Sequence, residues 1–201
     1  PLLDMDWEFE DDITLRFEEF LRVVWDEKTL FENMEFVAGA FNTKQNETPK
    51  DAIRRYLSSK FFDDHLKTYK KRPIYWLVSS GKEKAFEALI YLHRYNEATL
   101  ARMRNDYVIP LQGKMNKRSA YLEDQVKQGG SASLIRQYQK EVDTIKKKQL
   151  ELAKFDDLLK HYADQKISLD LDDGVKVNYG KFSTLLAKVK EITGEKPEEL
   201  N

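Results

Sequence analysis

The chain has 201 residues, of which 41% are hydrophobic and 34% charged, and its net charge at pH 7 is −1. This length suits one large domain or two small ones, and the near-neutral charge excludes a strong whole-chain attraction to nucleic acid. The charge is uneven, however, because residues 1–35 carry twelve acidic and three basic side chains, whereas the remainder carries 31 basic and 23 acidic ones. An acidic lead followed by a basic body permits a local anion-binding site.

The chain contains no cysteine, which excludes disulfides, thiolate zinc sites and cysteine nucleophiles. That composition fits a reducing cytoplasm, so we expect a cytoplasmic protein. No apolar run approaches the roughly 20 residues of a membrane span, so we expect no membrane partner. The acidic start at residues 1–12 is unlike a signal peptide and lacks an initiator methionine, so we expect a fragment of a longer protein.

Residues 1–69 are expected to form an N-terminal helical cluster. Apolar residues recur there at helical spacing, and capping residues stand before two of the runs. Asp11-Asp12 can cap the first helix, and Thr48-Pro49 is typical of an N-cap followed by the first helical position. The expected helices cover residues 11–26, 27–40, 49–57 and 61–69.

Residues 70–95 are expected to form a central β-hairpin. Residues 74–78 are aromatic and β-branched, as strands commonly are, and residues 86–91 can return as the second strand. The connection between them is polar and contains one glycine, which suits a hairpin loop. Tyr75 and Trp76 would lie on opposite faces of the first strand, so at most one of them can point into a one-sided core.

Residues 96–162 are expected to form a long antiparallel pair of helices, the helical hairpin. The first helix has helical apolar spacing to about Gln128, and Pro110 should kink or split it. Gly129-Gly130 breaks the pattern, and Ser133 can cap the second helix, whose apolar residues repeat as in a coiled coil. The lysine run at residues 146–148 is interpreted as a solvated face of this helix rather than as a binding site.

Residues 163–201 are expected to contain a short hairpin and a C-terminal helix. Asp172-Asp173-Gly174 lies between two runs of alternating apolar and polar residues, which is a hairpin signal. The helix is expected from about residue 179 to residue 192. The sequence therefore predicts a mainly α fold with small β-hairpins, in which one compact unit carries the projecting helix pair.

Motifs for catalysis or metal binding are absent from the sequence. Gly81-Lys82 is not a P-loop, because Trp76 stands where that motif requires a glycine. His65, His93 and His161 lie far apart, without the spacing of metal ligands. We therefore predict no catalytic residue, no metal and no cofactor for this chain.

Basic side chains surround the predicted aromatic hairpin and the start of the following helix. Arginine and lysine in such an arrangement can grip the backbone of a nucleic acid, which supplies affinity rather than sequence choice. The alternative is a core hairpin with a solvated basic rim. The hypothesis assigns phosphate contacts to seven residues: Lys70, Lys71, Arg72, Lys82, Lys84, Arg102 and Arg104.

Long segments of the chain resemble one protein family. TYKKRPIYWLVSSGKEKAFEALIYLHRYNEATLARMRNDYVIPLQGK, at residues 68–114, resembles the C-terminal region of the adenine-specific DNA methyltransferases of type 1 BREX phage-defence systems, the PglX family. WEFEDDITLRFEEFLRVVW (7–25) and ETPKDAIRRYL (47–57) resemble the segments before that block, and KISLDLDDGVKVNYGKF (166–182) resembles the closing segment. The likeness covers most of the chain and is least distinctive over residues 117–154.

The resemblance implies a larger enzyme, whose upstream Rossmann-like domain binds S-adenosylmethionine and methylates adenine N6 in a short asymmetric DNA site. Such a domain needs an Asn/Asp-Pro-Pro-aromatic motif and a glycine-rich cofactor loop, and this sequence contains no Pro-Pro. The resemblance thus implies a non-catalytic module for DNA binding and target recognition, with double-stranded DNA and the upstream domain as partners. The alternative is a structural module that packs on the catalytic domain or on another BREX component.

Overall fold

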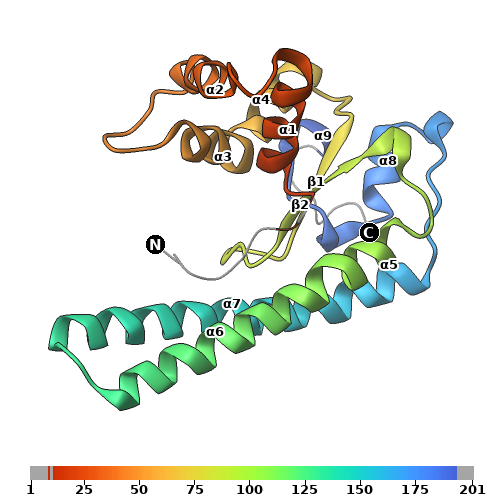
Figure 1. Cartoon of the computed structure of the whole chain (residues 1–201). Coiled ribbons are helices and arrows are strands. Elements are labelled where there is room, and N and C mark those ends of the chain that lie inside the picture. The colour runs from red at the N-terminus through yellow and green to blue at the C-terminus, as the bar shows by residue number, and fades with distance from the viewer. Residues whose placement is uncertain (1–8, 10, 194–201) are drawn as a thin grey trace. The chain divides into compact units, whose positions relative to one another are not determined.

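The computed structural model describes Phe9 and residues 11–193. These residues divide after Lys70 into two compact units. Helices predominate in both units, and the one sheet of the described residues is a two-stranded antiparallel hairpin (Figure 1). The predicted mainly α class is confirmed.

The first unit contains α1 (Ile13–Trp25), α2 (Leu30–Gly39), α3 (Pro49–Ser59) and α4 (Phe61–Tyr69). The predicted caps are confirmed, because the Asp12 carboxylate accepts from two backbone N–H groups of α1 and the Thr48 hydroxyl accepts from the N–H of Asp51. The helices enclose a small apolar core made of Leu21, Leu30, Met34, Ala38, Ala52 and Ile53.

The second unit begins with the predicted hairpin, β1 (Tyr75–Ser79) and β2 (Glu87–Tyr91), in which Tyr75 pairs with Tyr91. Trp76 is only 1% exposed, and its ring packs edge-on against Tyr179 and Phe182 at centroid distances of 5.0 and 5.8 Å. Tyr75 points to the other face, where its ring lies 5.1 Å from that of Tyr91. The prediction that only one of the two aromatic residues enters the core is confirmed.

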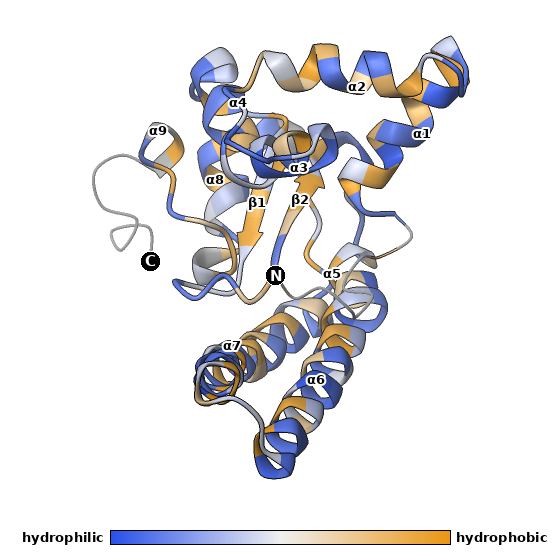
Figure 2. Ribbon diagram, turned by 60° about the vertical axis from the view of Figure 1, so that its left-hand side comes forward, coloured by the Kyte–Doolittle hydropathy of each residue, from blue (hydrophilic) through white to orange (hydrophobic). Residues whose placement is uncertain are grey.

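The predicted pair of long helices is present, with α6 (Ile109–Gln128) and α7 (Ala132–Asp164) running antiparallel (Figure 1). In Figure 2 their apolar residues lie largely where the two helices face each other. The Arg118 Nε donates to Glu141 Oε1 across this contact at 2.8 Å. Ser131, rather than the predicted Ser133, caps α7, because its hydroxyl accepts from the N–H of Leu134.

The helix before α6 is interrupted one turn earlier than the proline predicts. A π-helical turn, Arg104–Val108, joins α5 (Thr99–Met103) to α6, and the Ile109 N–H bonds to the carbonyl of Arg104 five residues back. The wider turn makes room at the point where the ring of Pro110 would press on the preceding turn of a regular helix. The chain therefore passes the proline as a nearly continuous helix.

The second predicted hairpin is wrong, because its return strand is the helix α8 (Val175–Gly180). Alternation would place Val175, Val177 and Tyr179 on one face, yet Val177 is 55% exposed and Tyr179 is buried against Trp76. The side chain of Asn178 donates to the carbonyl of Gly174 at 3.0 Å and so holds the turn that precedes the helix.

The single C-terminal helix predicted over residues 179–192 is also wrong. That range instead holds the end of α8, a 3-10 turn (Ser183–Leu185) and a short helix α9 (Lys190–Thr193), with non-helical backbone between them. Between them the chain forms one bridge with β1, in which the Ala187 N–H donates to the Leu77 carbonyl at 2.8 Å. Two further 3-10 turns cover Leu92–Arg94 and Leu171–Asp173.

Candidate nucleic-acid interface

The loop between β1 and β2, residues 80–86, is fastened to α7 by one carboxylate. Oε1 of Glu151 accepts hydrogen bonds from the Ser80 hydroxyl (2.7 Å) and the Ala85 N–H (3.1 Å), and Oε2 accepts from the Glu83 N–H (2.8 Å). Burial raises the pKa of Glu151, but these hydrogen bonds outweigh burial and lower the pKa overall. The loop is therefore held by an acceptor that stays charged at neutral pH.

Packing reinforces this attachment of residues 80–86. The ring of Phe86 lies 5.7 Å from that of Phe155, one turn along α7 from Glu151. A Cβ at Gly81 would stand 2.8 Å from Oε2 of Glu151, and the backbone φ there is +136°, so only glycine fits at this close approach. Hydrogen bonds and ring packing from α7 together fix the loop backbone.

Two of the predicted phosphate-contacting residues project from this fixed loop. The Lys82 side chain is 90% exposed and lies 3.9 Å from the Glu83 carboxylate. Lys84 is also exposed, and its ammonium lies 3.4 Å from the Glu87 carboxylate. Contacts this exposed contribute little energy, so both ammonium groups remain available to an anion.

Four of the other predicted residues are exposed and lie outside this loop. Lys71 and Arg72 are exposed in the turn before β1, and Lys70 is the last residue of the first unit. Arg102 on α5 is 74% exposed and lies 3.9 Å from Asp106.

Arg104 is the exception among the predicted residues, because it is paired inside the helix contact. Its Nη2 donates to Oδ2 of Asp156 on α7 at 2.9 Å, its Nε lies 2.8 Å from Oδ1, and the side chain is only 26% exposed. The structure thus brings Lys82 and Lys84 together on one loop and uses Arg104 to join two helices.

Sequence analysis missed Glu151, because its partners lie 66 to 71 residues away along the chain. No local pattern marks a carboxylate that serves a distant loop. Among residues 9 and 11–193, no group of three histidine, aspartate or glutamate side chains is placed to hold a metal ion. No described helix combines the length and apolar character that a membrane span needs.

We expect the change Glu151→Gln to loosen the loop, because the amide would turn an N–H donor toward the N–H of Glu83 or of Ala85. One lost hydrogen bond of about 1.4 kcal/mol corresponds to roughly tenfold faster amide exchange. Hydrogen exchange of the full-length protein should show this change in residues 80–86 and leave the β1–β2 pairing protected. Asp157→Asn, at an exposed carboxylate on the same helix, is the control. Unchanged loop protection in Glu151→Gln would show that Glu151 does not hold the loop.

No family model matches the sequence. The whole chain aligns at 55% identity over 207 residues with the "Adenine-specific methyltransferase BrxX" of Escherichia coli O9:H4 (strain HS). It also aligns over 90% of its length at 41% identity with the "Adenine-specific methyltransferase PglX" of Lacticaseibacillus casei (strain Zhang). The chain spans only 17% and 15% of these two relatives and matches a part toward their C-terminal ends. The chain accordingly belongs to the BrxX and PglX family of adenine-specific methyltransferases, of which it represents a small C-terminal part.

Proposed function

We propose that this chain is a non-catalytic module of a site-specific adenine-N6 DNA methyltransferase of a BREX phage-defence system, and that the module contributes to DNA binding. In this proposal the catalytic part of the same enzyme binds S-adenosylmethionine and methylates the target adenine. The observation that carries the proposal is the loop held by Glu151, which presents Lys82 and Lys84 on a fixed backbone.

The geometry of the loop suits contact with DNA phosphates. A loop that is already ordered loses little conformational entropy when its lysines meet an anion. Lysine binds phosphate as a point charge, so these contacts add affinity and position the duplex without choosing its sequence. Non-specific contacts of this kind give dissociation constants on the order of 10⁻⁴ to 10⁻⁶ M at physiological salt.

The test is charge reversal on the loop of the full-length protein, in the variant Lys82→Glu/Lys84→Glu. We expect the slope of log K against log salt, which is negative, to decrease in magnitude by about 2. DNA binding should weaken by at least about tenfold at 0.1 M salt, and methylation should slow. The measurements are fluorescence anisotropy on a duplex with the target site and transfer of labelled methyl groups.

The matched control is Lys117→Glu/Lys127→Glu, which reverses two exposed charges on α6. Both variants should keep the parental melting temperature. If the loop variant binds and methylates like the parent, the basic rim of the hairpin is merely solvated, and the DNA-binding proposal fails.

A structural packing module is the second candidate function, and one feature of the first unit favours it. Large apolar side chains stand exposed on α1 and α2, among them Val23, Trp25, Phe31 and Phe36. Exposed apolar groups gathered on neighbouring elements are typical of protein interfaces. In that case the chain would dock on the catalytic domain or on another BREX component, and the loop variant would leave DNA binding unchanged.

A further inference from the structure

The basic residues of α7 do not all lie on one side of the helix. Lys146 turns toward α6, where its ammonium lies 2.8 Å from the Glu123 carboxylate. Four other basic residues recur at intervals of four, seven and seven positions, which places them on one face of a helix. We call this set the α7 basic face: Arg136, Lys140, Lys147 and Lys154.

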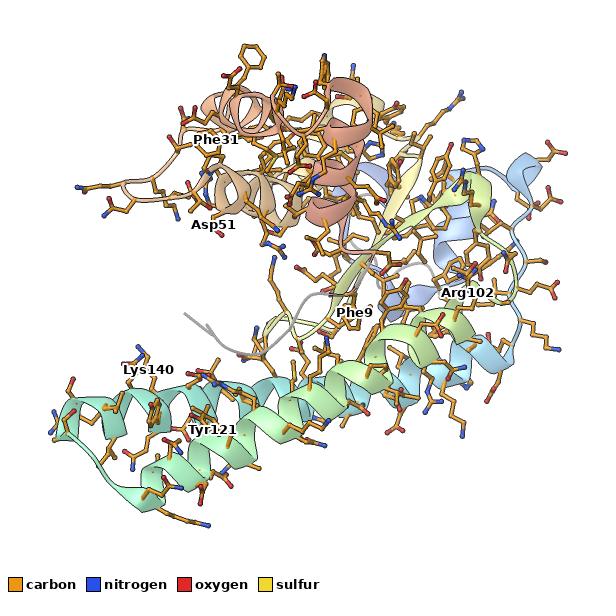
Figure 3. All side chains as sticks on the ribbon, in the orientation of Figure 1. Phe9, Phe31, Asp51, Arg102, Tyr121 and Lys140 are labelled. Carbon is orange, nitrogen blue, oxygen red and sulfur yellow. The ribbon has the colours of Figure 1, made fainter. Side chains whose placement is uncertain are left out.

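The α7 basic face points away from α6. The buried residues Val142, Ile145 and Leu152 mark the side of α7 that packs in the unit. At about 100° per residue, the basic face lies roughly 150° around the helix from that side. Figure 3 shows Lys140 extending from the side of α7 that is turned away from α6. All four basic side chains are exposed, and within the described residues no ion pair joins any of them to a carboxylate.

The α7 basic face is continuous with the loop that carries Lys82 and Lys84. Glu151, which holds that loop, stands four residues after Lys147 and three residues before Lys154, so each lysine is about one helical turn from it. The two surfaces therefore meet at Glu151.

The acidic groups near this surface are few. Asp143 lies on the same side of α7 between Lys140 and Lys147, and Glu83 and Glu87 lie beside the loop lysines. The six basic groups of the loop and the α7 basic face outnumber these three acidic groups, and the carboxylate of Glu151 is occupied by the loop. The combined surface is thus positive along its length.

We propose that the α7 basic face binds the phosphate backbone of duplex DNA, as an extension of the loop contact toward the tip of the helix pair. This inference rests on the proposed function and names a second surface for it. From Arg136 to Lys154 the helix rises about 27 Å, which is the length of roughly eight base pairs. A helix with cations on one side can contact phosphates over that length without reading bases.

The experiment compares two triple variants of the full-length protein that remove the same charge. The test variant is Lys140→Gln/Lys147→Gln/Lys154→Gln. The control is Lys117→Gln/Lys127→Gln/Lys160→Gln. Its first two positions are exposed on α6, and the third is exposed on α7 outside the α7 basic face. Each change exchanges one good helix former for another, so both variants should keep their helical circular dichroism and melting temperature.

We expect the test variant to decrease the magnitude of the slope of log K against log salt by about 3. It should weaken DNA binding on the order of 100-fold at 0.1 M salt. The loss should be equal for duplexes with and without the target site, because phosphate contacts carry no sequence information. The control should bind within about threefold of the parent, since its lysines lie off the surface.

The loop variant Lys82→Glu/Lys84→Glu, measured beside them, separates the two proposals. If the loop variant weakens binding while the α7 test variant matches its control, the α7 proposal is overturned and the proposed function stands. If the parent protein binds no duplex, both proposals are overturned. A test variant that keeps the parental salt slope but loses an acidic protein partner also overturns the α7 proposal.

Discussion

Replacing Trp76 by alanine is expected to lower the free energy of unfolding by about 3–5 kcal/mol, the usual cost of removing a fully buried aromatic side chain. Trp76 is 1% exposed and packs edge-on against Tyr179 of α8 and Phe182 after it. Its removal would open a cavity between the hairpin and the C-terminal segment, two parts that are far apart in sequence. Urea denaturation followed by circular dichroism measures the change.

Two further variants test the assignment of Trp76 to the core. Trp76→Phe keeps an aromatic ring and should cost clearly less than the alanine change. Tyr75→Ala lies on the other face of β1, where the ring is half-exposed against Tyr91, and should cost about 1 kcal/mol. If Tyr75→Ala destabilised the protein as much as Trp76→Ala, the two faces of the hairpin would be assigned wrongly.

Charge reversal at Arg104 is expected to cost about 3 kcal/mol of stability, because it breaks a partly buried ion pair and places a second carboxylate beside Asp156. Arg102→Glu is the matched control, two residues away and 74% exposed, and should cost less than about 0.5 kcal/mol. Thermal unfolding of both variants measures the two losses of stability, and equal losses would contradict the role of the Arg104–Asp156 pair. Exchanging the pair, in Arg104→Asp/Asp156→Arg, should recover part of the lost stability.

This prediction also bears on the DNA-binding hypothesis, which includes Arg104 among the phosphate contacts. A guanidinium held 2.9 Å from a carboxylate by a hydrogen bond is committed to packing α7 against the π-helical turn. If Arg104→Glu folds with parental stability yet loses DNA affinity, Arg104 contacts phosphate after all. For that reason the loop variant, which leaves Arg104 intact, is the cleaner test of DNA binding.

The two wrong predictions, the second hairpin and the single helix over residues 179–192, both concern the C-terminal part of the chain, where local sequence signals conflict with packing. Asp172-Asp173-Gly174 is typical of a hairpin turn, but it also precedes a helix here, because glycine can adopt the positive φ of +80° that the chain has just before α8. Tyr179, which packs on Trp76, is buried together with its neighbour Asn178, whereas Val177 is exposed; this pattern fits a helix and not a strand, in which neighbours alternate between faces. A contact about 100 residues away along the chain cannot be seen in the alternation of nearby residues.

The sequence by itself determined the features that depend on near neighbours. The caps at Asp12 and Thr48 act within three residues, and the two strands of the hairpin are joined by a short loop, so residue type and spacing were enough. The family likewise followed from the sequence, because the 55% identity over the whole chain is found by comparing amino-acid sequences alone.

Only the tertiary structure decided which charged side chains are available to a partner. In the sequence Lys146 and Lys147 are equivalent neighbours, but the helix turns about 100° between them, so Lys146 meets Glu123 while Lys147 faces solvent. Arg104 and Glu151 find their partners on other elements more than 50 residues away. Ion pairs and hydrogen bonds depend on distance in space, and that distance is set by how the helices pack.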